Sequence, residues 1–152
     1  MVTKIYRLKK VKLSFLHCIS SYPNEDQNSY LSNITFLQKK FNCAIGISDH
    51  TNGIKIPIYG AILGAQIIEK HFTLDRQLPG PDHMASLEPK ELERMVQEIR
   101  AVGLALGDGR KVPAASEENT AAVARKSLVA ARDIAAGEVL TGDLIAIRRP
   151  PP

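Results

Sequence analysis

Short apolar runs that end in polar side chains recur along the first two thirds of the chain. The runs are too short for helices and are punctuated by glycines, which is typical of buried parallel strands with functional groups at their carboxyl ends. The segments between the runs carry apolar residues at helical spacing. The pattern predicts strands over 13–18, 44–47 and 65–70, each followed by a helix, at 30–41, from near Pro57, and at 89–106.

Three successive strand–helix units predict a parallel α/β arrangement. The crossover in such a unit is right-handed, so neighbouring strands end at the same edge of the sheet. His50 follows the second strand and His71 follows the third, and the two histidines should therefore converge on that edge. Three units are too few for a closed (β/α)8 barrel, which needs about 250 residues.

The pattern of apolar and polar residues changes in the last third of the chain. Residues 107–119 have the composition of a linker, and a phosphate-binding loop is disfavoured there because no strand precedes the glycines. Short β segments are predicted beyond it at 127–130, 139–140 and 144–147. We therefore expect a first domain at 1–106, a linker at 107–119, and a small β domain at 120–152.

Charge and composition argue against some classes of function. The net charge is +4, with 20 basic and 16 acidic residues spread along the chain, which does not predict a nucleic-acid-binding protein. No apolar stretch approaches the roughly 18 residues of a membrane span. Cys18 and Cys43 lie in or beside apolar runs, which predicts buried free thiols, with a disulfide as the less favoured alternative. These features predict a cytoplasmic protein.

Histidine and aspartate residues near the strand ends are the candidates for metal binding and catalysis. Imidazoles held by His50 and His71 at strand ends suit manganese, zinc and related ions, but two such histidines alone are more often rim or core residues. His17 is expected to orient its neighbours, and His83 to lie on a surface loop. Asp49 either caps the turn that follows it or acts chemically.

A series of short motifs, ordered and spaced between about residues 11 and 150, resembles the sialic acid synthases, including N-acetylneuraminate synthase and enzymes making other nonulosonic acids. The motifs are Leu-His-Cys at 16–18, Ser-Tyr-Pro at 21–23, Gly-Ile-Ser-Asp-His-Thr at 46–51, Ile-Glu-Lys-His-Phe-Thr-Leu-Asp at 68–75, Gly-Pro-Asp-His at 80–83, Ser-Leu-Glu-Pro at 86–89, Ala-Arg-Lys-Ser-Leu-Val at 124–129 and Arg-Pro at 149–150.

The resemblance implies a partial (β/α)8 TIM barrel, made of its last three β/α units, followed by an incomplete antifreeze-like (SAF) β domain. The family's first five strands, its general acid/base glutamate and its phosphate-holding lysines have no counterpart in this sequence. We therefore expect the chain to be the carboxy-terminal part of such an enzyme.

The resemblance also implies a transferase of sialic acid biosynthesis. These synthases form a carbon–carbon bond between phosphoenolpyruvate and N-acetylmannosamine, or a related 2-acetamido sugar in its open-chain form, and release phosphate. A divalent metal, commonly Mn2+ or Mg2+, polarises the aldehyde. The enzymes are dimers in which the small domain of one chain caps the partner's barrel, so we expect a homodimer, or pairing with an amino-terminal half.

The family's site residues map onto this sequence position by position. Ser20 stands where relatives often have asparagine, and Arg149 is followed by three prolines where the family has Pro-Gly, so a solvated surface charge is an equal alternative for Arg149. The matching positions are His50 and His71 for the metal and, with the carboxylate of Glu69, for catalysis; Ser20 and Ser48 for phosphoenolpyruvate; and Tyr22, Asp82 and Arg149 for the sugar.

Two other function classes remain open. One is a non-catalytic remnant that pairs with a missing amino-terminal half, since strand 13–18 without an upstream neighbour presents a bare edge. The other is a metal-dependent, aldolase-like lyase. No Schiff-base lysine is evident at a strand end, which disfavours this class, although Lys70 is not excluded.

Overall fold

The computed structural model describes residues 11–149, without the side chain of Ala122. The outer ends of the two predicted domains, at 1–10 and 150–152, lie outside the described residues. The chain divides into two compact units, Met1–Asp108 and Gly109–Pro152. Each unit is described by itself.

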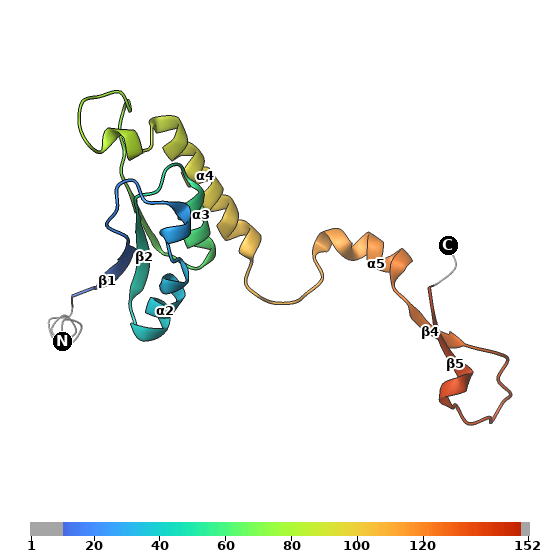
Figure 1. The fold of residues 1–152 in the computed structure, drawn as a ribbon. Coiled ribbons are helices and arrows are strands. Elements are labelled where there is room, and N and C mark those ends of the chain that lie inside the picture. Colours follow the sequence, from blue (N-terminus) through green and yellow to red (C-terminus); the bar gives the residue numbers. More distant parts are fainter. Residues whose placement is uncertain (1–10, 150–152) are drawn as a thin grey trace. The chain divides into compact units, whose positions relative to one another are not determined.

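The first unit is a parallel sheet with helices packed against it, as the sequence pattern predicted. The strands lie in the order β1-β2-β3, and each connection contains a helix. Helices α2 and α3 contact the central strand, and α4 lies beside α3 (Figure 1). The elements are β1 (Ser14–Cys18), α2 (Ser32–Lys40), β2 (Ala44–Asp49), α3 (Lys55–Ile62), β3 (Ile67–Lys70) and α4 (Pro89–Leu106).

The core lies between β2 and the two helices that contact it. Ile45 and Ile47 of β2 pack with Ile34 of α2 and Ile56 of α3, and these four side chains are at most 4% exposed. Because β2 has a strand on each side, its backbone is fully paired and its residues are buried from Ile45 to Asp49. This is the condition under which a parallel strand reads as a continuous apolar run.

Gly46 lets the three strands approach closely. A Cβ atom at this position would lie 2.6 Å from Cδ2 of Leu16 on β1 and 2.7 Å from Cβ of Ile67 on β3. Both distances are well inside van der Waals contact, so the central strand has no room for a side chain here. The position of β3 relative to β2 therefore depends on this glycine.

Element boundaries differ slightly from the prediction. The first helix begins at Ser32 and not at residue 30, because Tyr30 has a positive φ of 41° and forms a turn. The third strand begins at Ile67 and not at residue 65, after a turn with Gly64 at a φ of 87°. Helix α3 begins at Lys55, so Pro57 occupies the first turn, as predicted.

The long loop at 72–88 is ordered by one arginine. The Arg76 guanidinium pairs with Glu91 of α4 and donates from Nε to the Ser86 carbonyl at 2.9 Å, while the Arg76 backbone N–H donates to Glu88. The hydrogen bond between the two side chains lowers the pKa of Glu91 and raises the pKa of Arg76. The loop also contains a short 3-10 helix, His83–Ala85.

The second unit contains an antiparallel pair, β4 (Ser127–Ala130) and β5 (Ile145–Arg148), preceded by the helix α5 (Glu118–Ala124). The strands predicted at 127–130 and 144–147 are thus confirmed, the second with a shift of one residue. The strand predicted at 139–140 is wrong, because these residues lie in the loop between β4 and β5. Helix α5 was not predicted, because its alanine-rich sequence has no apolar periodicity.

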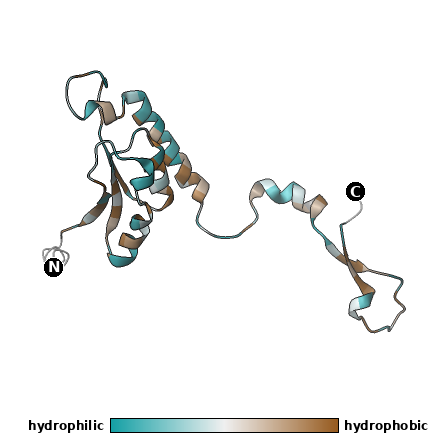
Figure 2. Cartoon of the chain, viewed as in Figure 1, coloured by the Kyte–Doolittle hydropathy of each residue, from teal (hydrophilic) through white to brown (hydrophobic). Residues whose placement is uncertain are grey.

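Apolar side chains of the second unit are largely exposed. Figure 2 shows hydrophobic residues along β4 and β5. Leu128 and Ile147 on these strands are 72% and 67% exposed, whereas Leu144 is 1% exposed. The unit thus buries little apolar surface of its own.

Both cysteines are free, as expected, but Cys18 is exposed and Cys43 is only partly buried. The expected burial of Cys18 is wrong because successive side chains of a strand point to opposite faces. His17 faces the covered side of β1, and Cys18 therefore faces the open side. Across residues 11–149, no helix combines the length and hydropathy needed to cross a membrane.

Replacing Gly46 by alanine should force β2 and β3 apart. Overpacking of this kind costs about 1–3 kcal/mol. Urea unfolding of G46A should show a lower midpoint than the wild-type chain. Gly103 in α4 provides the control, since an added Cβ there meets nothing within 4 Å. G103A should raise stability by about 0.5–1 kcal/mol, and a G46A midpoint equal to wild type would contradict the close-approach role.

Replacing Glu91 by glutamine should make unfolding less dependent on pH. The pKa of Glu91 is lowered from its ordinary 4.5 by Arg76, so the pair stabilises the fold above that value and is lost as pH falls through the folded-state pKa. The unfolding free energies of wild type and E91Q should differ most near neutral pH. The difference should stay below about 1 kcal/mol, because the side chains are 35% and 36% exposed. A difference that stays constant from neutral to acid pH would contradict this.

Candidate functional site

The carboxyl ends of the three strands meet at one edge of the sheet. The parallel register places Cys18 beside Ser48, Ser48 beside Glu69, and Asp49 beside Lys70. Residues that directly follow the strands therefore lie along this edge. All the site candidates except Arg149 belong to these strand ends or to the loops that leave them.

His50 and His71 lie together at this edge, as the strand pattern predicted. Their ring centroids are 5.3 Å apart and the rings are perpendicular. His50 is 7% exposed, and the His71 side chain is 32% exposed. His50 is thus held inside the protein, whereas His71 is partly open to solvent.

Both rings have an oxygen atom near Nδ1, but only His50 forms a hydrogen bond there. His50 Nδ1 lies 2.9 Å from the Ile19 carbonyl, which can only accept, so Nδ1 carries the proton and Nε2 keeps its lone pair. His71 Nδ1 lies 3.9 Å from Oδ2 of Asp82. A hydrogen bond from Nδ1 to an oxygen is the usual arrangement for a histidine that binds a metal through Nε2, and His50 has it. The separation at His71 is longer than a hydrogen bond, so either ring nitrogen of His71 can face a ligand.

The imidazole pair fits part of a divalent metal site. Metal–nitrogen distances to imidazole are about 2.0–2.1 Å for zinc, and rings 5.3 Å apart are close enough to share one ion. Within the described part of the chain, no three or more His, Cys, Asp or Glu side chains are grouped to hold a metal. The remaining ligand positions would belong to substrate, water or other protein groups.

Tyr22 covers the histidine pair. Its ring centroid lies 4.0 Å from that of His50 and 5.5 Å from that of His71. The loop that carries Tyr22 is fixed where it passes β2, because the Asn24 backbone N–H donates to the His50 carbonyl at 2.8 Å. Tyr22 itself is 55% exposed and so presents part of its ring to solvent.

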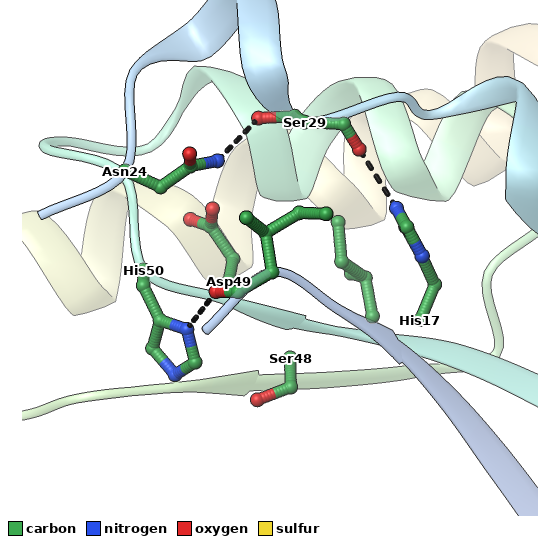
Figure 3. A pocket seen from close by; sticks show the side chains of 8 residues that line it. His17, Asn24, Ser29, Ser48, Asp49 and His50 are labelled. Atoms are coloured by element: carbon green, nitrogen blue, oxygen red, sulfur yellow. Dashed lines mark hydrogen bonds between the residues drawn. The ribbon is translucent and has the colours of Figure 1, made fainter. Parts of the chain in front are cut away.

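His17 anchors the far end of the same loop. His17 Nε2 lies 2.7 Å from the Ser29 carbonyl, and the Asn24 amide donates to the Ser29 hydroxyl (Figure 3). The expectation that His17 orients its neighbours is confirmed. The cavity beneath this loop has a volume of about 10 Å³, room for about one water. A molecule larger than water therefore does not fit inside it.

Ser48 and Glu69 form a polar pair across β2 and β3. The Ser48 hydroxyl donates to Oε1 of Glu69 at 2.6 Å. Ser48 is 8% exposed, whereas Glu69 is exposed. Ser20 lies, exposed, in the loop after β1. A hydroxyl and a carboxylate therefore stand beside the two imidazoles.

Asp49 and Lys70 form a buried ion pair on the opposite face of the sheet. Lys70 Nζ lies 2.5 Å from Oδ2 of Asp49, and the side chains are 3% and 2% exposed. Asp49 also accepts from the Thr51 backbone N–H, as a cap of the following turn would. The pair was not predicted. Its signal was available, because each member directly precedes a histidine on strands that were expected to be neighbours.

Three further residues lie beyond the strand ends themselves. Asp82 belongs to the 72–88 loop, and its side chain is 58% exposed beside His71. His83, expected on a surface loop, is half-buried and bonds through Nδ1 to the Thr73 hydroxyl at 2.8 Å. Arg149 is exposed in the second unit.

Comparison with known proteins places this site in a family. The profile of the NeuB family matches residues 1–111, and that of the SAF domain matches residues 125–152. The N,N'-diacetyllegionaminic acid synthase of Campylobacter jejuni (serotype O:2) is 42% identical over 142 residues, which cover 93% of this chain and 42% of the relative. The N-acetylneuraminate-9-phosphate synthase of Mus musculus is 40% identical over 135 residues, covering 88% and 38%.

A solved structure supports the same family assignment. The N-acetylneuraminic acid (sialic acid) synthetase of Leptospira borgpetersenii, in complex with citrate, superposes with a TM-score of 0.72 and 44% identity, covering 78% of this chain and 41% of that one. The chain thus spans about two fifths of the length of these relatives. With the family profile matching residues 1–111 of 152, the protein belongs to the NeuB family and carries an SAF domain at its carboxyl end.

Proposed function

We propose that the protein is the carboxy-terminal part of a nonulosonic acid synthase that condenses phosphoenolpyruvate with a 2-acetamido sugar and releases phosphate. The observation that carries this proposal is the rim of the sheet. Two imidazoles lie 5.3 Å apart there, beside the hydrogen-bonded Ser48 and Glu69, in a chain of the NeuB family.

His50, through Nε2, and His71 would hold a divalent ion, Mn2+ or Mg2+. Such an ion supplies Lewis acidity to the aldehyde oxygen of the open-chain sugar. The protein's part is to fix the rings: the Ile19 carbonyl holds the proton on His50 Nδ1, and Tyr22 covers the ring faces. Two protein ligands alone give weak binding, so occupancy would depend on substrate.

Ser48 and Ser20 would contact phosphoenolpyruvate. The Ser48 proton is donated to Glu69, so a phosphate oxygen could accept it only after the hydroxyl turns. Glu69 is exposed and its carboxylate can accept more than one hydrogen bond, so it could also accept from a substrate hydroxyl or water.

Tyr22 and Asp82 would contact the sugar. Both side chains are more than half exposed and flank His71, so a sugar whose aldehyde approaches the histidine pair meets an aromatic ring and a carboxylate. Arg149 would hold the acetamido group. Because it lies in the second unit, this role belongs with the proposed dimer, in which that unit caps the partner's barrel.

A lyase that forms an imine would have to use Lys70, which does not suit imine chemistry. An imine-forming lysine needs a neutral amine that a carbonyl substrate can reach. The Lys70 side chain is 3% exposed and is paired with Asp49. The non-catalytic alternative rests on β1, which has one neighbouring strand in the described part of the chain, and an activity assay separates it from the synthase.

Removing either proposed metal ligand should weaken Mn2+ binding. Titration calorimetry of the 152-residue chain should show weak Mn2+ binding, and H50A or H71A should weaken it by about 10-fold or more. H83A is the matched control, since His83 bonds to Thr73 and should leave the affinity unchanged. Equal affinity in H71A and wild type would contradict the assignment.

Condensation should require an amino-terminal half. The chain is mixed with the segment of the Campylobacter jejuni relative that precedes the matching region, and phosphate release from phosphoenolpyruvate and N-acetylmannosamine is followed. The mixture should be active, the chain alone inactive, and E69Q should lower the rate by about 100-fold.

E93Q, on the exposed side of α4, serves as the control and should match the wild-type mixture. Activity of the chain alone would show that it is not an incomplete enzyme. A mixture that forms a complex yet releases no phosphate would favour the non-catalytic remnant.

A further inference from the structure

Two charged side chains at the ends of β2 and β3 are next to the histidine pair in the sequence but lie outside the rim that carries the proposed chemistry. Asp49 and Lys70 are opposite each other in the parallel register of β2 and β3. Each directly precedes one of the two histidines in the sequence. Since side chains of a strand alternate between faces, the pair lies on the face opposite Ser48 and Glu69.

The pair is buried, and both members form several hydrogen bonds. Lys70 Nζ donates to Oδ2 of Asp49 and to the Thr51 carbonyl, both at 2.5 Å. Asp49 also accepts from the Thr51 N–H at 3.0 Å and from the Thr51 hydroxyl at 3.1 Å. Thr51 is 0% exposed. The ammonium therefore holds the residues on both sides of His50.

Stability alone does not account for such a pair. Desolvation of two charges costs as much as their attraction returns, and apolar residues of similar volume often stabilise a fold equally well or better. Apolar replacements would, however, lack directed bonds. The ion pair adds hydrogen bonds of defined geometry, and these bonds connect the end of β2 to the end of β3.

The consequence falls on the imidazoles. The Lys70 ammonium is bound to residues 49 and 51, and the Lys70 backbone leads directly into His71. The backbone around His50 is tied in turn to the Tyr22 loop through the Asn24 N–H. A shift of Lys70 would therefore move the two rings relative to each other.

Resting on the metal role proposed above, we infer that the buried Asp49–Lys70 ion pair positions His50 and His71 for a shared divalent ion. Both members are positioning residues, since they act through the histidines and do not reach the ion or the substrate themselves. The same positioning applies to the metal-free protein, in which the ion pair sets the distance between the imidazole rings of His50 and His71.

The test replaces the ion pair by apolar side chains of similar length in D49L/K70M. Three quantities are measured on the full chain: the thermal midpoint, the Mn2+ dissociation constant by calorimetry, and the nuclear Overhauser effect between the ring protons of His50 and His71. The midpoint should be equal or higher, the Mn2+ affinity should be about 10-fold or more weaker, and the Overhauser effect should disappear. The matched control is I45V, which changes the fully buried core of β2. It should lower the midpoint and leave the affinity and the Overhauser effect unchanged.

Unchanged affinity and an intact Overhauser effect in folded D49L/K70M would overturn the positioning role. If the double variant does not fold, T51V gives the answer, because it removes one bond to Asp49 and keeps the charges balanced. A weaker Overhauser effect in T51V supports the inference, and an unchanged one overturns it. If the wild-type chain binds no Mn2+, the metal proposal fails, while the Overhauser effect still decides whether the ion pair sets the histidine geometry.

Discussion

The parallel pairing of β2 with β3 is the interaction on which the rest of the first unit depends. Its register sets Ser48 opposite Glu69 on one face and Asp49 opposite Lys70 on the other. A slip of one residue would exchange the faces of one strand's side chains. Ser48 and Glu69 would then no longer face each other, and Asp49 or Lys70 would be buried without its ion-pair partner. The chemistry at the rim is thus a property of strand register before it is a property of any single side chain.

The sequence predicted most of the first unit because local signals and tertiary packing agree there. Helix α4 has the predicted bounds, with Pro89 in its first turn and Gly107 as its C-cap, and with Glu91 bonding back to the Glu88 N–H. Strand β2 was evident as an apolar run because neighbours bury it on both sides. The second unit was harder, because its apolar residues at 139–140 resemble a strand but find no pairing partner, and pattern alone does not supply one.

The candidate site was predictable to a similar depth. The convergence of His50 and His71 follows from the parallel strands, but the roles given to Tyr22, Asp82 and Arg149 came from family resemblance. Bonds to backbone atoms, such as that from His50 Nδ1 to the Ile19 carbonyl, leave no trace in residue identity. The burial of Lys70 depends on helices that cover the sheet, and a lysine near a strand end more often reaches solvent.

Strand β2 serves the core and the rim within six residues. Ile45 and Ile47 pack against the helices, Ser48 lies at the rim, and Asp49 is buried in the ion pair with Lys70. A substitution in this segment that alters the rim would therefore act on the core as well. The exposed loops around residues 20–22 and 79–82 have more freedom to vary, because a change there leaves the strand beneath them undisturbed.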